Sequence, residues 1–202
     1  MPAFPRTILP ISATPPKQPQ ALISTGFSGK STTRSAIIAG RVWEENFPPL
    51  YYTAAATRGW LAQVQAGFRL GTLWTVDHRQ YLTANGAGGG TPLVNGGSQT
   101  GNTVNTDGWP NSTLVLKAGD LVKFGTLNLV YEMQADANSN GSGQATLSVD
   151  PLVISGGSPA DNATVIYGAN VTFRALIEDF DPGAIGINGW ITGIKVRFRE
   201  VP

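Results

Sequence analysis

The chain has 202 residues and no cysteine, which excludes a disulfide framework and a thiolate metal site. Charged residues make up only 13% of the sequence, against about 25% in an ordinary soluble domain, and the net charge is +1. Disordered proteins and proteins that coat nucleic acids need more charge than this. The basic residues are also scattered, without interleaved aromatic residues. We therefore expect no specific nucleic-acid binding.

Long apolar segments are lacking as well. No run approaches the roughly 20 residues that cross a membrane, and residues 1–20 have no apolar core of a signal peptide. We expect no membrane association. Residues 1–20 instead carry six prolines, which predict an extended, polyproline-like arm. A chain with little charge and 25 glycines is typical of a protein that is made inside the cell and works within an assembly.

Strand patterns dominate what is present. Residues 121–123, 127–133 and 145–149 alternate between apolar and polar side chains and are separated by turns rich in glycine and asparagine, which predicts short antiparallel strands. These strands indicate a small barrel over about residues 91–152. The glycine-rich residues 86–90 predict a flexible crossing into that barrel.

The segments on either side of the barrel predict a second unit. Strands are expected within residues 35–47, with a bend near Gly40, and at 72–76, 165–166, 170–177 and 191–201. The only helix is expected at residues 53–68, because an apolar stripe follows a helical period there and Gly71 offers a C-terminal cap. The sequence thus predicts a mainly β chain, with residues 1–85 and 153–202 in one discontinuous domain and residues 86–152 inserted as another.

Two motifs suggest ligand sites. Gly26–Thr32 (GFSGKST) resembles a phosphate-binding loop, but the β-prone segment after Ser31 lacks the required helix, and we favour a surface turn. Asp136–Gly141 (DANSNG) matches the start of a calcium loop, but the closing glutamate is replaced by Leu147. A hairpin turn explains that composition equally well.

Candidate catalytic groups are few. Glu178, Asp179 and Asp181 form the tightest carboxylate cluster, but Asp-Pro-Gly follows as a strong turn signal, and a solvated loop is the preferred interpretation. His78 is the only histidine, and its neighbour Asp77 alone does not make a catalytic triad. The sequence therefore predicts no enzyme, no cofactor and no metal site.

Two aromatic residues are candidates for sugar binding. Trp109 and Trp190 lie beside proline or glycine in predicted loops, where an exposed ring could stack on a glycan. The same residues commonly plug the end of a barrel or an interface. Trp109 is the candidate glycan contact.

The segment 115–125 (VLKAGDLVKFG), between GGSQTGNTVNTDGWP and NGSGQATLSVDPLV, resembles the inserted domain of distal tail proteins of long-tailed bacteriophages. Upstream, RVWEENFPPL precedes the predicted helix and GTLWTVDH, in the order that this family shows. Downstream, VTFRALIED and KVRFREVP are similar to its last strands. The resemblance covers residues 35–202 in element order, and the proline-rich arm lies outside it.

The resemblance implies a virion structural protein of the tail tip, made in the bacterial cytoplasm. Its fold would be a β-sandwich ring domain with one packed helix and an inserted OB-like β-barrel. Six copies would form a ring between the tail tube protein and the tail hub, baseplate or central fibre protein, leaving a channel for DNA. The alternative is a carbohydrate-binding module that contacts a host surface glycan through the OB-like barrel.

Overall fold

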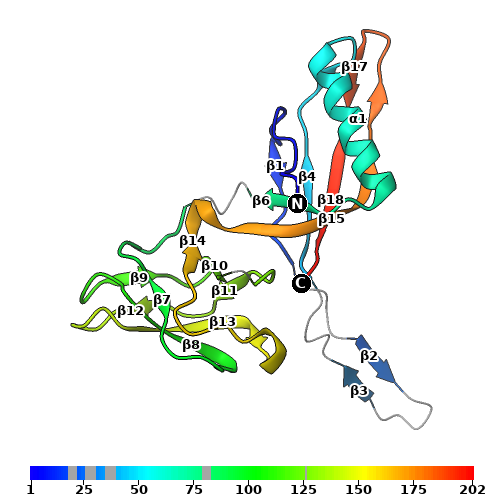
Figure 1. The fold of residues 1–202 in the computed structure, drawn as a ribbon. Coiled ribbons are helices and arrows are strands. Elements are labelled where there is room, and N and C mark those ends of the chain that lie inside the picture. The colour runs from blue at the N-terminus through cyan, green and yellow to red at the C-terminus, as the bar shows by residue number, and fades with distance from the viewer. Residues whose placement is uncertain (18–21, 26–30, 35–39, 79–82, 126) are drawn as a thin grey trace. The chain divides into compact units, whose positions relative to one another are not determined.

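Two compact units make up the chain. The computed structural model describes residues 1–17, 22–25, 31–34, 40–78, 83–125 and 127–202 (Figure 1). Met1–Val76 and Phe173–Pro202 form the first, which we call the flanking unit, and Asp77–Thr172 form the second, the inserted unit. Strands dominate, and α1 is the only α-helix among the described residues. The predicted mainly β fold, a sandwich with a barrel, is confirmed.

A five-stranded sheet, in the order β1-β4-β18-β15-β6, builds the flanking unit. Alternate residues of its central strands are buried, so that Trp43 lies 4.8 Å from Phe173 and 5.2 Å from Phe198 between ring centroids. Because β4 precedes the inserted unit and β15 and β18 follow it, both ends of the chain contribute to one core. The strands are β1 (Ser12–Ala13), β4 (Val42–Asn46), β6 (Trp74–Asp77), β15 (Thr172–Asp181) and β18 (Lys195–Glu200).

The helix α1 (Ala55–Leu70) begins and ends two residues later than predicted. It buries Trp60 and Val64 as expected from the apolar stripe, whereas Phe68 is exposed. Gly71 ends the helix in the left-handed conformation (φ 60°), as its predicted capping role requires. A three-stranded sheet completes the flanking unit, in the order β16 (Ala184–Ile185), β17 (Trp190–Thr192), β5 (Leu50–Tyr51).

The N-terminal segment, predicted as an extended, polyproline-like arm, docks onto the sheet of the flanking unit. Phe4 is buried with its ring centroid 5.0 Å from that of Phe198, and β1 pairs with β4. Proline removes an N–H donor but keeps its carbonyl acceptor. Pro2 O accepts a hydrogen bond from the Thr75 amide (2.9 Å), so a proline-rich segment still docks onto the sheet.

A buried ion pair ties the same segment to the core. The Arg6 guanidinium donates two hydrogen bonds to the Glu45 carboxylate, at 2.5 and 3.0 Å, and the Glu45 side chain is fully buried. The indole nitrogen of Trp60 donates to Pro5 O at 3.0 Å. Residues 1–17 are therefore an integral part of the flanking unit.

The inserted unit is a nearly closed barrel. Its sheet runs in the order β14-β10-β11-β13-β8-β7, and the two edge strands approach each other through the Leu93–Thr164 bridge. The Val94 amide donates to Ala163 O at 2.8 Å beside that bridge. The strands are β7 (Leu93–Val94), β8 (Gly101–Asp107), β10 (Leu121–Phe124), β11 (Tyr131–Met133), β13 (Ala145–Val153) and β14 (Val165–Tyr167), with a separate pair of β9 (Leu114–Leu116) and β12 (Ala137–Asn138).

The inserted unit is longer at both ends than the predicted residues 86–152. The chain leaves the barrel after Thr172, because β14 pairs with β10 and supplies one of its strands. A loop with glycine and proline at residues 155–160 precedes β14, and its composition suggested that the barrel had already ended. Residues 77–78 and 83–85 also belong to this unit.

The glycine-rich segment at residues 86–90 is not a free crossing between the units. Gly88 N donates to Val115 O at 2.9 Å, and Gly89 N donates to the Tyr167 hydroxyl at 2.7 Å. Gly88, Gly89 and Gly90 all have positive φ, and a Cβ on Gly88 would lie 2.6 Å from the Tyr167 ring. Glycine is needed here for close approach to the barrel.

A hairpin of β2 (Leu22–Thr25) and β3 (Ser31–Arg34) lies within residues 22–34 of the flanking unit. The phosphate-loop motif overlaps it: Gly26–Lys30 lie outside the described residues, and Ser31 begins a strand rather than a helix. The predicted bend near Gly40 adjoins residues 35–39, which also lie outside the described part. None of the described helices is long and apolar enough to span a bilayer.

Candidate functional site

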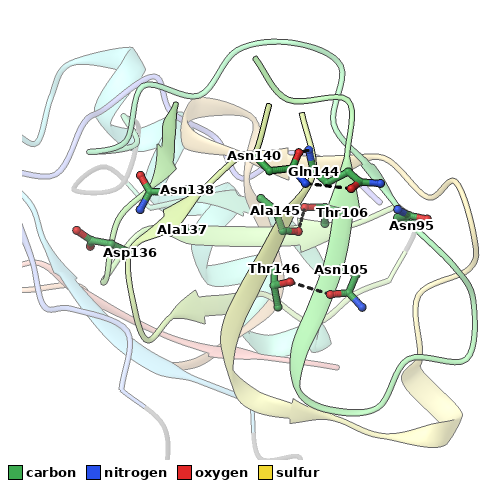
Figure 2. Close-up of a pocket in the computed structure, with 10 residues that line it drawn as sticks. All are labelled: Asn95, Asn105, Thr106, Asp136, Ala137, Asn138, Asn140, Gln144, Ala145 and Thr146. Carbon is green, nitrogen blue, oxygen red and sulfur yellow. Dashed lines mark hydrogen bonds between the residues drawn. The ribbon is translucent and has the colours of Figure 1, made fainter. Parts of the chain in front are cut away.

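An open groove lined with amide side chains lies on the inserted unit, and we call it the polar groove (Figure 2). Its volume is about 530 Å³, within the range of small-molecule sites. The lining combines two neighbouring barrel strands, the β12 segment and the turn that leads into β13. It consists of Asn95, Asn105, Thr106, Asp136, Ala137, Asn138, Asn140, Gln144, Ala145 and Thr146.

Strand alternation places these polar groups outside the barrel. Asn105 of β8 pairs with Thr146 of β13, and both are exposed, whereas the adjacent Thr106 and Ala145 are buried. The Thr146 hydroxyl donates to Asn105 Oδ1 at 2.8 Å (Figure 2). This bond leaves the Nδ2 group of Asn105 with no partner among the described residues.

A tight turn fixes the amides at the β13 end of the groove. Asn140 Oδ1 accepts the backbone amides of Ser142 and Gln144, each at 2.9 Å, and Asn140 Nδ2 donates to Gln144 Oε1 at 3.0 Å. These are the local bonds that asparagine makes in turns. Gln144 Nε2 then keeps both of its donors available within the described structure.

Asp136 is the only charged residue in the described lining of the polar groove. Its Oδ1 accepts the Ala118 amide at 2.9 Å. The side chains of Asn95 and Asn138 have no hydrogen-bond partner in the described part of the chain. The groove therefore offers several amide donors and acceptors beside a single carboxylate.

The calcium-loop alternative for Asp136–Gly141 finds no support among the described residues. Ala137 and Asn138 form strand β12, paired with β9, and the Asn140 side chain is used within its own turn. No group of three or more acidic, histidine or cysteine side chains in this part of the chain has the geometry for a metal. The hairpin interpretation of Asp136–Gly141 holds.

Trp109 does not offer a face to a sugar, although it was expected to be exposed. It is only 4% exposed, and its indole nitrogen donates to Thr106 Oγ1 at 2.8 Å. Its ring packs 5.4 Å from that of Tyr167 between centroids. Gly108 and Pro110 marked a loop correctly, but this loop folds the indole into the barrel core.

The candidate catalytic groups do not form a pocket. Glu178 pairs with Arg199 and, at 3.0 Å, with Arg197 of the neighbouring strand. Strand β15 extends through Asp181, so Asp179 and Asp181 lie on an exposed strand end rather than in the predicted loop. His78 is buried. Glu178 is thus part of an ion-pair cluster, and Asp179 and Asp181 are exposed carboxylates at the end of a strand. His78 is a histidine of the core.

The flanking unit carries an exposed apolar cluster, which we call the apolar end. Its residues belong to the three-stranded sheet and the loops beside it. Tyr51 and Trp190 are register partners with ring centroids 5.6 Å apart, and Ile187 is fully exposed. An adjoining hollow of about 380 Å³ between α1 and β16 includes Leu61 and Pro182. The apolar end comprises Tyr51, Tyr52, Ile185, Ile187 and Trp190.

Asp120 has a role that sequence reasoning missed. Its carboxylate is 2% exposed and accepts four hydrogen bonds: from Asn85 N (2.7 Å), Asn85 Nδ2 (2.9 Å), Gly86 N (3.1 Å) and Lys117 N (2.8 Å). The carboxylate fastens the incoming chain to the β9–β10 turn. The Ala-Gly-Asp turn was visible in the sequence, but Asn85 and Gly86 lie more than 30 positions away.

No family model matches the chain, and no curated protein matches it.

Proposed function

We propose that this chain is a structural protein of a bacteriophage tail tip, a distal tail adaptor that acts as a ring of six copies. The ring joins the tail tube to the hub, baseplate or central fibre and leaves a channel for DNA. The proposal assigns the chain no catalytic role and no cofactor.

The architecture of the chain carries this proposal. The distal tail family, which the sequence resembles, has a barrel inserted in a β-sandwich ring domain. In this chain β4 and β18 pair side by side although the entire inserted unit separates them in sequence. Such an arrangement keeps the sandwich intact while a second unit is displayed from it.

The apolar end supports the ring. Monomeric proteins seldom expose contiguous aromatic and aliphatic side chains such as Tyr51, Trp190 and Ile187, and such patches commonly mark protein contacts. In the ring, the apolar end of one copy packs against a different surface of the next copy. This is a head-to-tail contact, and it closes when the rotation between copies divides a full turn.

The low charge of the chain agrees with this role, since surfaces covered by neighbours need few charges. Several of the existing charges are also paired within the unit, as Arg197 and Arg199 are with Glu178. These ion pairs stabilise the face of the sheet. The contact between copies would then be stabilised mainly by burial of apolar side chains.

Mass photometry and negative-stain electron microscopy of the full chain test the proposal. Six copies of 21.3 kDa give a species of about 128 kDa with a central channel. The double variant Ile187→Asp/Trp190→Asp places charges in the contact, and we expect it to remain a monomer.

Leu70→Asp is the matched control. Leu70 is also exposed in the flanking unit, but it ends α1, about 22 Å along the helix axis from its first residue. We expect this variant to form the ring. A wild-type protein that stays monomeric at high concentration would overturn the proposed function, and a ring unaffected by Ile187→Asp/Trp190→Asp would exclude the apolar end as the contact.

A further inference from the structure

We propose that the polar groove of the inserted unit binds a neutral saccharide. This inference goes beyond the adaptor role and does not depend on ring formation, because every residue involved lies within Asp77–Thr172. It also differs from a stacking site at Trp109, which is buried.

The donors and acceptors of the groove match the chemistry of a sugar. Each sugar hydroxyl is both a donor and an acceptor, and neighbouring hydroxyls come in pairs. A side-chain amide presents an acceptor oxygen and an NH₂ donor in one plane and can bond both members of such a pair. The Asn95 and Asn138 amides and the NH₂ groups of Asn105 and Gln144 have no partners among the described residues, so they are available to a ligand.

The charge at the polar groove favours a neutral ligand over an anionic one. Among the described residues, no lysine, arginine or histidine lines the groove, and Asp136 supplies a negative charge at one side of it. A phosphate or a uronate would lack a cation to pair with and would be repelled by that carboxylate. A hydroxyl, in contrast, can donate a hydrogen bond to it.

Two of the amides are held in place before a ligand arrives. Asn105 accepts from Thr146 across the strand pair, and the Asn140 turn orients Gln144. Such fixing lowers the entropic cost of binding. The groove is open and has no aromatic side chain in its lining, so we expect weak binding, with a Kd of about 1 mM for a trisaccharide.

Trp109 provides a reporter beneath the groove. Its indole donates to Thr106 Oγ1, and Thr106 lines the groove. The full chain is titrated with maltotriose, cellotriose and N,N′,N″-triacetylchitotriose as neutral probes, and with trigalacturonate as the anionic probe. Two-dimensional ¹H–¹⁵N NMR follows the Trp109 indole and the side-chain amides of Asn105, Asn138 and Gln144. We expect saturable shifts with at least one neutral trisaccharide and none with trigalacturonate.

The double variant Asn105→Ala/Asn138→Ala removes two of the amides, and we expect the Kd to rise about tenfold or more. Asn102→Ala is the matched control, because Asn102 is an exposed asparagine of the same strand β8 that does not line the groove. It should bind like the wild type. An unchanged thermal midpoint in both variants verifies that the barrel is folded.

Three results would overturn the inference. The first is an absence of saturable shifts with all three neutral trisaccharides. The second is equal affinity in the wild type and in Asn105→Ala/Asn138→Ala. The third is binding of trigalacturonate as tight as that of the best neutral probe. Failure of the ring experiment would leave these measurements unaffected, so the two proposals fail separately.

Discussion

Replacing Asp120 by alanine should destabilise the inserted unit strongly. The carboxylate accepts four hydrogen bonds in a site that is almost completely buried, two of them from the backbone and side chain of Asn85. A hydrogen bond to a charged group contributes about 1.5–3 kcal/mol, but four bonds to one carboxylate are not additive, and entering water replaces some of them. We therefore expect Asp120→Ala to lower the free energy of unfolding by about 3–5 kcal/mol.

Asp120→Asn keeps the shape of the side chain but halves the number of oxygen atoms that can accept hydrogen bonds. The amide keeps one acceptor oxygen, but its NH₂ group then faces N–H donors of Gly86 or Lys117, and we expect a loss of about 2–3 kcal/mol. Asp136→Ala is the control, because Asp136 is exposed and accepts a single backbone amide within the same unit. Its cost should stay at about 0.5–1 kcal/mol.

Urea titration followed by NMR can read this unit selectively, because Trp109 is its only tryptophan. The indole cross-peak of Trp109 gives the unfolding midpoint, and hydrogen exchange of the Gly86 amide reports the fastening of the incoming chain directly. If Asp120→Ala and Asp136→Ala lost the same stability, or if exchange at Gly86 were unchanged in Asp120→Ala, the reasoning about this carboxylate would be refuted.

Two further predictions concern the flanking unit. Gly59→Ala should stabilise it by about 0.5–1 kcal/mol, seen as a higher thermal midpoint, because Gly59 is exposed within α1 and an added Cβ meets nothing within 4 Å; a lower midpoint would contradict this. Arg6→Ala should lower the free energy of unfolding, measured by chemical denaturation, by about 3 kcal/mol. The substitution removes the guanidinium that donates two hydrogen bonds to the fully buried Glu45 carboxylate. Arg6→Lys should recover only part of that loss, because lysine cannot make the two parallel bonds, and full recovery would count against the geometry described.

Local patterns were sufficient to predict most of the fold. Alternation located strands β10, β11 and β13, and the apolar stripe around Trp60 and Val64 located the helix. These predictions agree with the structure because each depends only on side chains a few positions apart in the sequence. The assignment to one discontinuous unit and one insert also followed from the order of elements, although both boundaries moved.

The errors came from long-range contacts. Prolines predicted an extended arm but not its docking, because Phe4 and Arg6 find their partners about 40 or more residues away. Trp109 had two interpretations, an exposed glycan contact and a plug of the barrel, and the structure agrees with the second, because the loop closes over the barrel core. The polar groove was likewise invisible, because Asn105 and Asn138 lie on different strands and only the tertiary fold brings them to one surface.

The pairing of β4 with β18 sets an order of events during synthesis. Glu44 and Arg197 are register partners about 150 residues apart, and the ribosome needs roughly 8–30 s to make that length of chain at 5–20 residues per second. Strand β4 therefore emerges long before its central neighbour exists, whereas every strand of the barrel is complete by Tyr167. The insert can fold co-translationally, while the sandwich around it is assembled only when the last strand has been released from the ribosomal tunnel.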